Sequence, residues 1–280
     1  MKPGIYNNLD IDEYHNSEGI SSTGISLLLD CPKRYHYEYH GKPEVLDPKE
    51  QQEARNKYKM GRALHMLVLE PEKFDATFYC MAEKVNLTTK IGKELWAKAE
   101  LEANGREILR AGSWEDIKAM AESVKSHSIW KEFKDGLVEQ SIYWEGGVFN
   151  TELKARPDIF NDRLIIDVKT TDSIKLFANS IYNYGYHRQA AMQIDGLKTV
   201  DGKKRLFAYF VVEKKAPYLT GCFTLDEVSL DQGRREYLDA AITYTECKHS
   251  DIWPDYQDQN DNKFRLISIP KWAIKSEEDK

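Results

Sequence analysis

The chain has 280 residues, of which 41% are hydrophobic and 31% charged, a composition typical of a soluble globular protein that can bury a substantial core. The net charge of −6 argues against indiscriminate coating of nucleic acid, although it is compatible with a local basic channel. No apolar run is long enough to span a membrane, and the first residues lack the apolar core of a signal peptide, so we expect a cytoplasmic protein.

The N-terminal part of the chain begins with residues 1–20, which show little periodicity and are predicted to form an extended arm or loop. Residues 21–29 follow as a short helix with serine and threonine N-caps. Pro32 can open a second helix, in which Lys33 and Arg34 stand among several tyrosines. This helix could face a nucleic-acid backbone, or it could pack its tyrosines inward, and both interpretations stay open.

A long helix is predicted over residues 49–69, closed by Pro71, and its last turns are apolar around His65. A lone histidine on an apolar helix face is ordinarily a core residue, and no acidic residue is adjacent to this one in sequence. Its partner must therefore come from elsewhere in the fold. A loop is predicted next, over residues 73–91, and then two amphipathic helices, over residues 92–109 and 114–127.

The second half of the chain alternates strands and helices. The predicted strands are residues 138–144, 148–156, 164–170, 206–212 and 218–225. The predicted helices are residues 174–181, 186–197 and 226–247. Residues 251–280 are expected to form an irregular tail that is disordered from Ser276 onward.

The most informative stretch runs from Lys154 to Thr170. Asp167 and Lys169 lie two residues apart in a predicted strand, so they share one face of the sheet. A turn at residues 161–162 would fold Asp158 back towards Asp167. Two carboxylates and a lysine at one sheet edge suit metal-dependent cleavage of phosphodiester bonds. Alternatively, the pair is an ordinary salt bridge on a solvated strand face, and Pro-Asp opens a common turn.

Together with His65 in Gly-Arg-Ala-Leu-His and with Gln189, these motifs resemble the RecB-type nucleases of the PD-(D/E)xK superfamily. The chain is most similar to the C-terminal exonuclease domain of RecE (exonuclease VIII) and to phage proteins built from that domain alone. The segments 21–35, 253–254 and 270–272 also resemble it, so the similarity spans nearly the whole chain.

The resemblance implies an α/β fold with a restriction-endonuclease-like core, in which a mixed central sheet is flanked by helices. We expect one domain over residues 1–280. Its predicted parts are a mainly helical region over 1–130, a nuclease core over 137–250 and a tail over 251–280. The cysteine-bound iron–sulfur cluster of some relatives is not expected, because Cys31 stands where a first cysteine would and no C-terminal cluster completes the set.

The resemblance also assigns roles to individual residues. Asp158 and Asp167 would be the metal-binding carboxylates, and Lys169 would orient or deprotonate the attacking water. His65 would be a further ligand, and the backbone carbonyl of Val168 would point at the metal. Oxygen ligands favour Mg²⁺, while a histidine in the shell would let Mn²⁺ substitute readily.

Other assignments are carried by the same resemblance. Gln189 would orient the lysine or contact the DNA strand, and Glu139 matches, less closely, an acidic residue ahead of the first strand pair. The family often has a tyrosine where this chain has Gln193, and Tyr186, one helical turn before Gln189, could replace it. The candidate DNA-contacting residues are Lys33, Arg34, Tyr186 and Arg188.

The implied activity is a metal-dependent, ATP-independent exodeoxyribonuclease that degrades linear double-stranded DNA from free 5′ ends and leaves 3′ single strands for recombination. The resemblance further implies a homo-oligomeric ring, a single-strand annealing protein as partner, and a bacterial host cell infected or inhabited by a bacteriophage. No P-loop motif occurs, so no built-in helicase motor is expected. The alternatives are a structure-selective or nonspecific endonuclease of the same fold, and a non-catalytic DNA-binding module, against which the intact Asp158, Asp167 and Lys169 argue.

Overall fold

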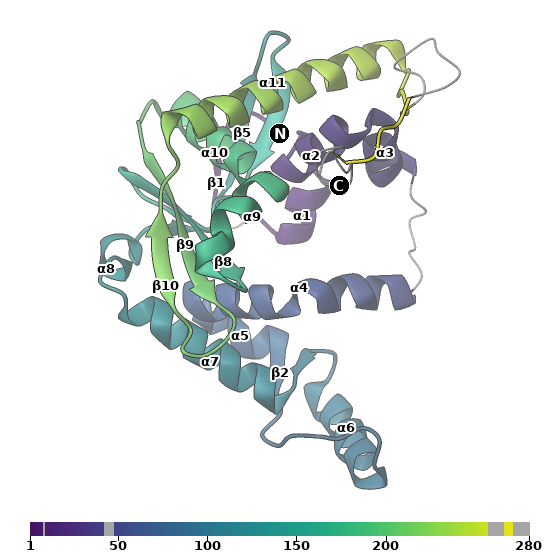
Figure 1. Ribbon diagram of the computed structural model, residues 1–280, viewed down its shortest axis with the longest axis vertical. Helices are drawn as coiled ribbons and strands as arrows, with labels where there is room; N and C mark the ends of the chain where they lie inside the picture. The colour runs from purple at the N-terminus through teal and green to yellow at the C-terminus, as the bar shows by residue number, and fades with distance from the viewer. Residues whose placement is uncertain (8, 42–47, 257–265, 271–280) are drawn as a thin grey trace, which may run out of the picture.

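The computed structural model describes residues 1–7, 9–41, 48–256 and 266–270 (Figure 1). Its helices are α1 (Ile11–Asn16), α2 (Ser22–Asp30), α3 (Pro32–His36), the π-helix η1 (Tyr37–Gly41), α4 (Pro48–Leu69), α5 (Pro71–Thr77), α6 (Lys90–Ala103), α7 (Ala111–Ser126), α8 (Trp130–Phe133), the 3₁₀ helix η2 (Ile174–Leu176), α9 (Phe177–Asn183), α10 (Tyr186–Asp201) and α11 (Glu227–Ser250). Its strands are β1 (Gly4–Tyr6), β2 (Phe78–Cys80), β3 (Glu107–Leu109), β4 (Leu137–Val138), β5 (Ser141–Gly146), β6 (Thr151–Ala155), β7 (Ile159–Phe160), β8 (Leu164–Thr171), β9 (Leu206–Glu213) and β10 (Thr220–Phe223).

A five-stranded mixed sheet with the order β10-β9-β8-β7-β4 forms the centre of the fold. Strands β8 and β9 are parallel from the pair Leu164↔Leu206 to the pair Thr171↔Glu213, and the other neighbours are antiparallel. Both faces of this sheet are covered, which explains why β8 and β9 are rich in branched and aromatic apolar residues. The predicted mixed sheet flanked by helices is therefore confirmed.

The two faces of the sheet pack against different parts of the chain. Ile165 faces a core shared with α2, α10, α11 and the strands β5 and β6. Ile166 and Val168 face a second core shared with α4, α5 and α7. Figure 1 shows these two groups of helices on opposite sides of the strands. Because neighbouring residues in a strand face opposite sides, β8 supplies side chains to both cores.

The predicted arm over residues 1–20 is wrong, because these residues contain β1 and α1. Strand β1 pairs with β5 in a second sheet, of order β1-β5-β6, with Gly4 opposite Tyr143. Helix α1 is capped by Asp10, whose side chain accepts hydrogen bonds from two backbone N–H groups of the first turn. The pairing joins residues far apart in sequence, so no local pattern announces it.

The predicted loop over residues 73–91 and the boundaries of three neighbouring elements are also corrected. Pro71 ends α4 as expected, but it also starts α5, which is followed by β2. The helix predicted to reach residue 109 ends at Ala103, and the following strand β3 pairs in parallel with β2. The strand predicted over 138–144 is split between two sheets, and the strand predicted from residue 148 begins at Thr151. The helices expected around residues 21–29, 49–69, 114–127, 186–197 and 226–247 are confirmed within a few residues.

Close packing of α11 against α10 positions the start of α10 over the sheet. At Gly233 of α11, a Cβ atom would lie only 2.3 Å from the carbonyl oxygen of His187. At Gly196 of α10, a Cβ atom would lie 2.7 Å from the ring of Trp144.

None of the described helices combines the length and apolar character that a membrane crossing requires.

Candidate active site

The site is built where β7 stops pairing with β8. Ile159 stands opposite Ile166, so the antiparallel register places Asp158 opposite Asp167 and Pro157 opposite Val168. Proline has no N–H to donate, and the pairing ends there. The two backbone groups of Val168 find other partners: its N–H donates to Asp158 Oδ2 at 2.6 Å, and its carbonyl oxygen lies 2.5 Å from Nε2 of His65.

This geometry agrees with the hairpin expected from the sequence, in which Asp158 folds back towards Asp167. It also answers where the partner of His65 comes from. His65, on α4, reaches the end of β7 from across the fold and contacts Asp158, with Nδ1 3.5 Å from Oδ2. The Val168 carbonyl lies at the site, as expected, while its side chain is buried in the core.

Three potential ligand groups cluster at this strand end. One ligand atom from each of His65, Glu139 and Asp158 lies within 4.8 Å of the others. Burial, and then the nearby Asp167 carboxylate, raise the pKa of Asp158 well above its ordinary range. A divalent cation would remove this penalty by neutralising the carboxylates, and the oxygen and imidazole donors suit Mg²⁺ or Mn²⁺. The residues present therefore fit a hard divalent metal.

Glu139 occupies a break between two strands rather than the start of one. It lies between β4 and β5 with a φ of 48°, an uncommon conformation for a residue other than glycine. Its backbone N–H donates to the carbonyl oxygen of Asp158 at 3.0 Å. Burial, followed by the charge of Asp158, raises the pKa of Glu139 to about 7.

Arg156 holds the Glu139 side chain in place and was not singled out in the sequence. Its Nε donates to Glu139 Oε2 at 2.9 Å, and Nη1 reaches the carbonyl oxygen of Leu9 and the hydroxyl of Ser141, both at 2.9 Å. The sequence does hold a signal for Arg156, because this residue directly precedes Pro157-Asp158. Strand alternation also places its side chain on the face of β6 opposite to the core.

The second carboxylate, Asp167, is completely buried and is engaged by two side chains. Lys169 forms an ion pair with Oδ2, and Nε2 of Gln189 donates to Oδ1 at 2.7 Å. Gln189 thus contacts the carboxylate that is paired with the lysine, and its expected role of orienting the lysine or contacting the DNA strand stays a prediction. Asp167 shares the strand end with Asp158, but Glu139 rather than Asp167 completes the three-residue cluster with His65.

Lys169 lies between the buried acid and an aromatic ring. Its Nζ is 4.8 Å from the ring centroid of Tyr186, at the start of α10. Burial lowers the pKa of Lys169, but the Asp167 and Asp158 carboxylates outweigh burial and hold the pKa above its ordinary range. The amine is therefore protonated at neutral pH and acts as a hydrogen-bond donor.

A family model described as a PDDEXK-like domain of unknown function (DUF3799) matches residues 21–262. The chain belongs to this family. The match confirms the expected superfamily fold, while the closer likeness to RecE remains a prediction. The chain is also similar to the crystal structure, at 2.19 Å resolution, of a protein from Eubacterium rectale described as a putative exonuclease. That comparison has a TM-score of 0.61 and 13% identity and covers 94% of this chain and 96% of the other, a likeness that shows a shared fold. No curated protein matches the chain.

In this PDDEXK-like chain, the basic residues suggested for DNA contact all have acidic partners. The ion pairs are Lys33–Asp255, Arg34–Asp30 and Arg188–Glu236. Tyr35 of the basic, aromatic helix is buried and stacks on Trp253, whereas Tyr37 and Tyr39 of the following π-helix are exposed, so the inward-packing interpretation holds for Tyr35 alone. Gln193, where relatives often have a tyrosine, is only 2% exposed and lies in the interior, whereas Tyr186 reaches the lysine of the site. All four cysteines are free.

Proposed function

We propose that this PDDEXK-like protein is a divalent-metal-dependent, ATP-independent exodeoxyribonuclease. The observation that carries the proposal is the convergence of His65, Glu139 and Asp158 beside the buried Asp167–Lys169 pair at one strand end. A cluster of carboxylates that disfavours joint ionisation, next to a protonated amine, is suited to binding a cation and a phosphodiester together.

Each residue has a distinct task in this proposal. His65, Asp158 and Glu139, with the Val168 carbonyl and the buried Asp167 nearby, would hold the cation. When bound, the cation stabilises negative charge on the phosphate and lowers the pKa of a bound water. Lys169 donates a hydrogen bond to the attacking water or to a phosphate oxygen, and Asp167 keeps that amine charged and in place.

Gln189 and Arg156 act through other residues in this scheme. The hydrogen bond from Gln189 orients the Asp167 carboxylate, and the Arg156 guanidinium orients Glu139. Partners of this kind commonly tune the affinity of the ligands that they hold.

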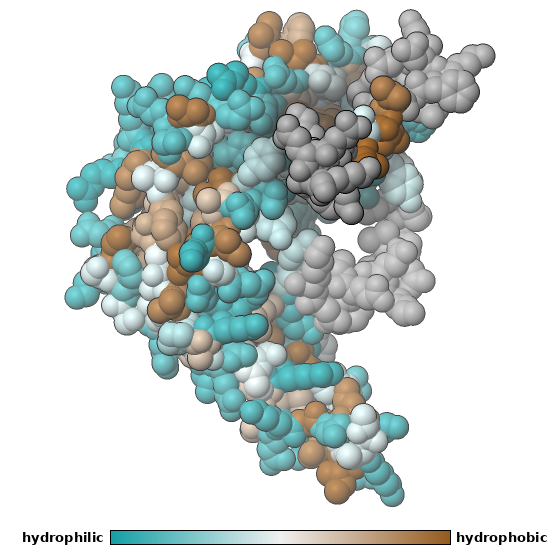
Figure 2. All heavy atoms as spheres, in the orientation of Figure 1, coloured by the Kyte–Doolittle hydropathy of each residue, from teal (hydrophilic) through white to brown (hydrophobic). Residues whose placement is uncertain are grey.

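The finer parts of the proposal follow the resemblance described above. The substrate is linear double-stranded DNA with free ends, the direction is 5′ to 3′, and the product is a 3′ single strand used in recombination by a single-strand annealing partner. The physiological metal is Mg²⁺, with Mn²⁺ able to substitute. The protein acts in the cytoplasm of a bacterial host as a homo-oligomeric ring, and the helix α6 offers support for self-association. It projects at the lower end of Figure 1 and exposes Ile91 and Leu101, in a region where Figure 2 shows hydrophobic residues together.

The test is degradation of linear and covalently closed circular duplexes by the purified chain, in Mg²⁺ and in EDTA. We expect Mg²⁺-dependent loss of the linear DNA alone, and early release of a 5′ label but not of a 3′ label. Equal attack on both forms would overturn the exonuclease claim and select the endonuclease. Early release of the 3′ label would show that digestion runs from 3′ to 5′. A monomer in light scattering would contradict the proposed homo-oligomeric ring.

A further inference from the structure

A group of tyrosines lies beside the lysine of the site. The ring of Tyr186 is 4.8 Å from Lys169 Nζ, and the ring centroid of Tyr184 is 5.6 Å from that of Tyr186. Tyr184 is 68% exposed, and Tyr182, on α9, is 73% exposed. The rings of these two residues are thus left largely in solvent. Tyr184 lies beside Tyr186, which contacts the lysine of the site, whereas Tyr182 stacks against the ring of His187.

A further exposed tyrosine stands on α4, the helix that carries His65. Tyr58, on α4, is 62% exposed and stands two helical turns before His65. Exposed aromatic side chains therefore stand on both α4 and the α9–α10 turn.

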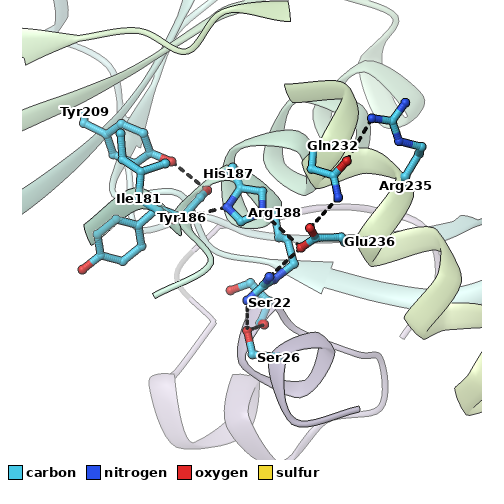
Figure 3. Close-up of polar contacts among 10 residues, drawn as sticks. All are labelled: Ser22, Ser26, Ile181, Tyr186, His187, Arg188, Tyr209, Gln232, Arg235 and Glu236. Atoms are coloured by element: carbon cyan, nitrogen blue, oxygen red, sulfur yellow. Dashed lines mark hydrogen bonds and ion pairs between the residues drawn. The ribbon is translucent and has the colours of Figure 1, made fainter. Parts of the chain in front are cut away.

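The backbone that carries these rings is held rigidly from behind (Figure 3). The Tyr209 hydroxyl donates to the carbonyl oxygen of Tyr186 at 2.7 Å. His187 is almost completely buried and contacts the carbonyl oxygen of Ile181 at 3.2 Å and Glu236 at 3.0 Å. In Figure 3 the Tyr186 ring points away from this polar network. The turn is thus ordered by its own contacts before any ligand binds, which lowers the entropic cost of using its rings to bind one.

The geometry of the turn brings the rings close together. Gly185 separates Tyr184 from Tyr186 and has a φ of 67°, which glycine adopts without strain. A Cβ atom there would lie 2.1 Å from the guanidinium of Arg188, the movable end of a long side chain, so it is the positive φ that disfavours any other residue at this position. The two tyrosines can therefore flank a reversal of the chain with no side chain between them.

We infer that Tyr184 stacks on an unpaired base next to the phosphodiester bond to be cut, so that the site takes a frayed or single-stranded DNA end; Tyr186, whose ring packs against Phe177 and Tyr209, supports the Tyr184 ring from the side of the lysine. The inference rests on the proposed nuclease function. Base stacking on exposed aromatic rings is tolerant of sequence, as a nuclease that degrades any DNA requires. A paired base inside a duplex presents no free face, so the Tyr184 ring selects nucleotides that have left the stack. The occupant is thus the same strand whose phosphate lies at Lys169.

The experiment measures stacking and cleavage separately. An oligonucleotide duplex carries 2-aminopurine in an unpaired 5′ overhang, with phosphorothioate linkages there to slow hydrolysis. Its fluorescence and anisotropy are followed with the full chain in Mg²⁺. The variants are Tyr184→Ala, Tyr184→Phe and the control Phe149→Ala, which removes an aromatic residue of similar exposure (52%) from the β5–β6 turn.

We expect the wild type, Tyr184→Phe and Phe149→Ala to quench the fluorescence, and Tyr184→Ala to quench less and to bind the overhang ~5- to 100-fold more weakly. With unmodified DNA, the wild type should cut overhanging ends faster than blunt ends, and Tyr184→Ala should lose that preference. Equal quenching and equal preference in Tyr184→Ala and wild type would overturn the inference while leaving the nuclease intact. Failure of the wild type to cut any DNA would instead overturn the proposed function, and quenching that depends on Tyr184 would then still support base stacking.

Discussion

The substitution Glu139→Gln should flatten the dependence of stability on pH. The pKa of Glu139 is raised from 4.5 to about 7 in the folded protein, chiefly by burial. Between these values the folded chain holds a proton that the unfolded chain has released, so the free energy of unfolding falls as pH rises through this window. The neutral form of Glu139 makes its full favourable contribution to stability at pH values below the pKa of this group in the unfolded chain. That contribution is lost as the pH rises through the pKa of the group in the folded protein.

The size of the effect follows from the same values. At about 1.4 kcal/mol for each tenfold change in acid strength, a rise from 4.5 to about 7 corresponds to about 3 kcal/mol. The side chain is 23% exposed, so water reduces this figure, and we expect about 2 kcal/mol between pH 5 and pH 8. Asp158, whose pKa is also raised, adds a change of the same sign.

The assay is urea unfolding at pH 5 and pH 8 in EDTA, for the wild type, Glu139→Gln and the control Glu145→Gln, a change at an exposed position of β5. Wild type and control should lose about 2 kcal/mol more than Glu139→Gln on going to pH 8. Mg²⁺ should stabilise the wild type more at pH 8 than at pH 5, because a cation competes with protons for the same carboxylates. An equal loss in wild type and Glu139→Gln would refute the reasoning, since Glu139 would then be ionised at both values.

Three further outcomes are expected from activity, metal binding and stability. Lys169→Ala should lower the rate of DNA hydrolysis about 100-fold or more without abolishing DNA binding, whereas Lys214→Ala, at a lysine paired with Asp172 and not with a carboxylate of the site, should match the wild type in a gel assay. Gln189→Ala should weaken Mg²⁺ binding about 10- to 100-fold by calorimetry, because a buried carboxylate loses the donor that orients it; unchanged affinity would contradict this role. Gly196→Ala should cost about 1–3 kcal/mol in urea unfolding because its Cβ meets a tryptophan ring, while Gly61→Ala, with open space around it in a helix, should gain about 0.5–1 kcal/mol.

The part of the candidate site that the sequence predicts is the part made by local geometry. Alternation in β8 places Asp167 and Lys169 on one face, and a short turn returns Asp158 to them. The grouping of these three side chains can therefore be predicted from a short stretch of sequence. The same reasoning cannot supply a partner for His65, because Asp158 reaches it only after α4 packs on the sheet. Gln189 was identified, yet its contact with Asp167 depends on how α10 crosses the strands.

The errors share a physical cause. Strand β1 and the β2–β3 pair are three residues long, and each is stabilised by a partner distant in sequence. The break at Glu139 needs a positive φ in a residue type that does not favour it, so tertiary contacts must impose it. Local patterns predict the long helices and the central strands well because their periodicity extends over many residues.

Val168 contributes to the candidate site through its peptide group and to the interior through its side chain. Any apolar residue of suitable size could occupy this position without altering the atoms offered at the strand end. The residue between Asp167 and Lys169 can therefore change as the surrounding hydrophobic core changes. An insertion or deletion there would instead place Asp167 and Lys169 on opposite faces of the sheet. Members of the fold can thus diverge far in sequence while keeping the same spatial arrangement, and a spacing of one intervening residue is a more durable signature than any identity at that position.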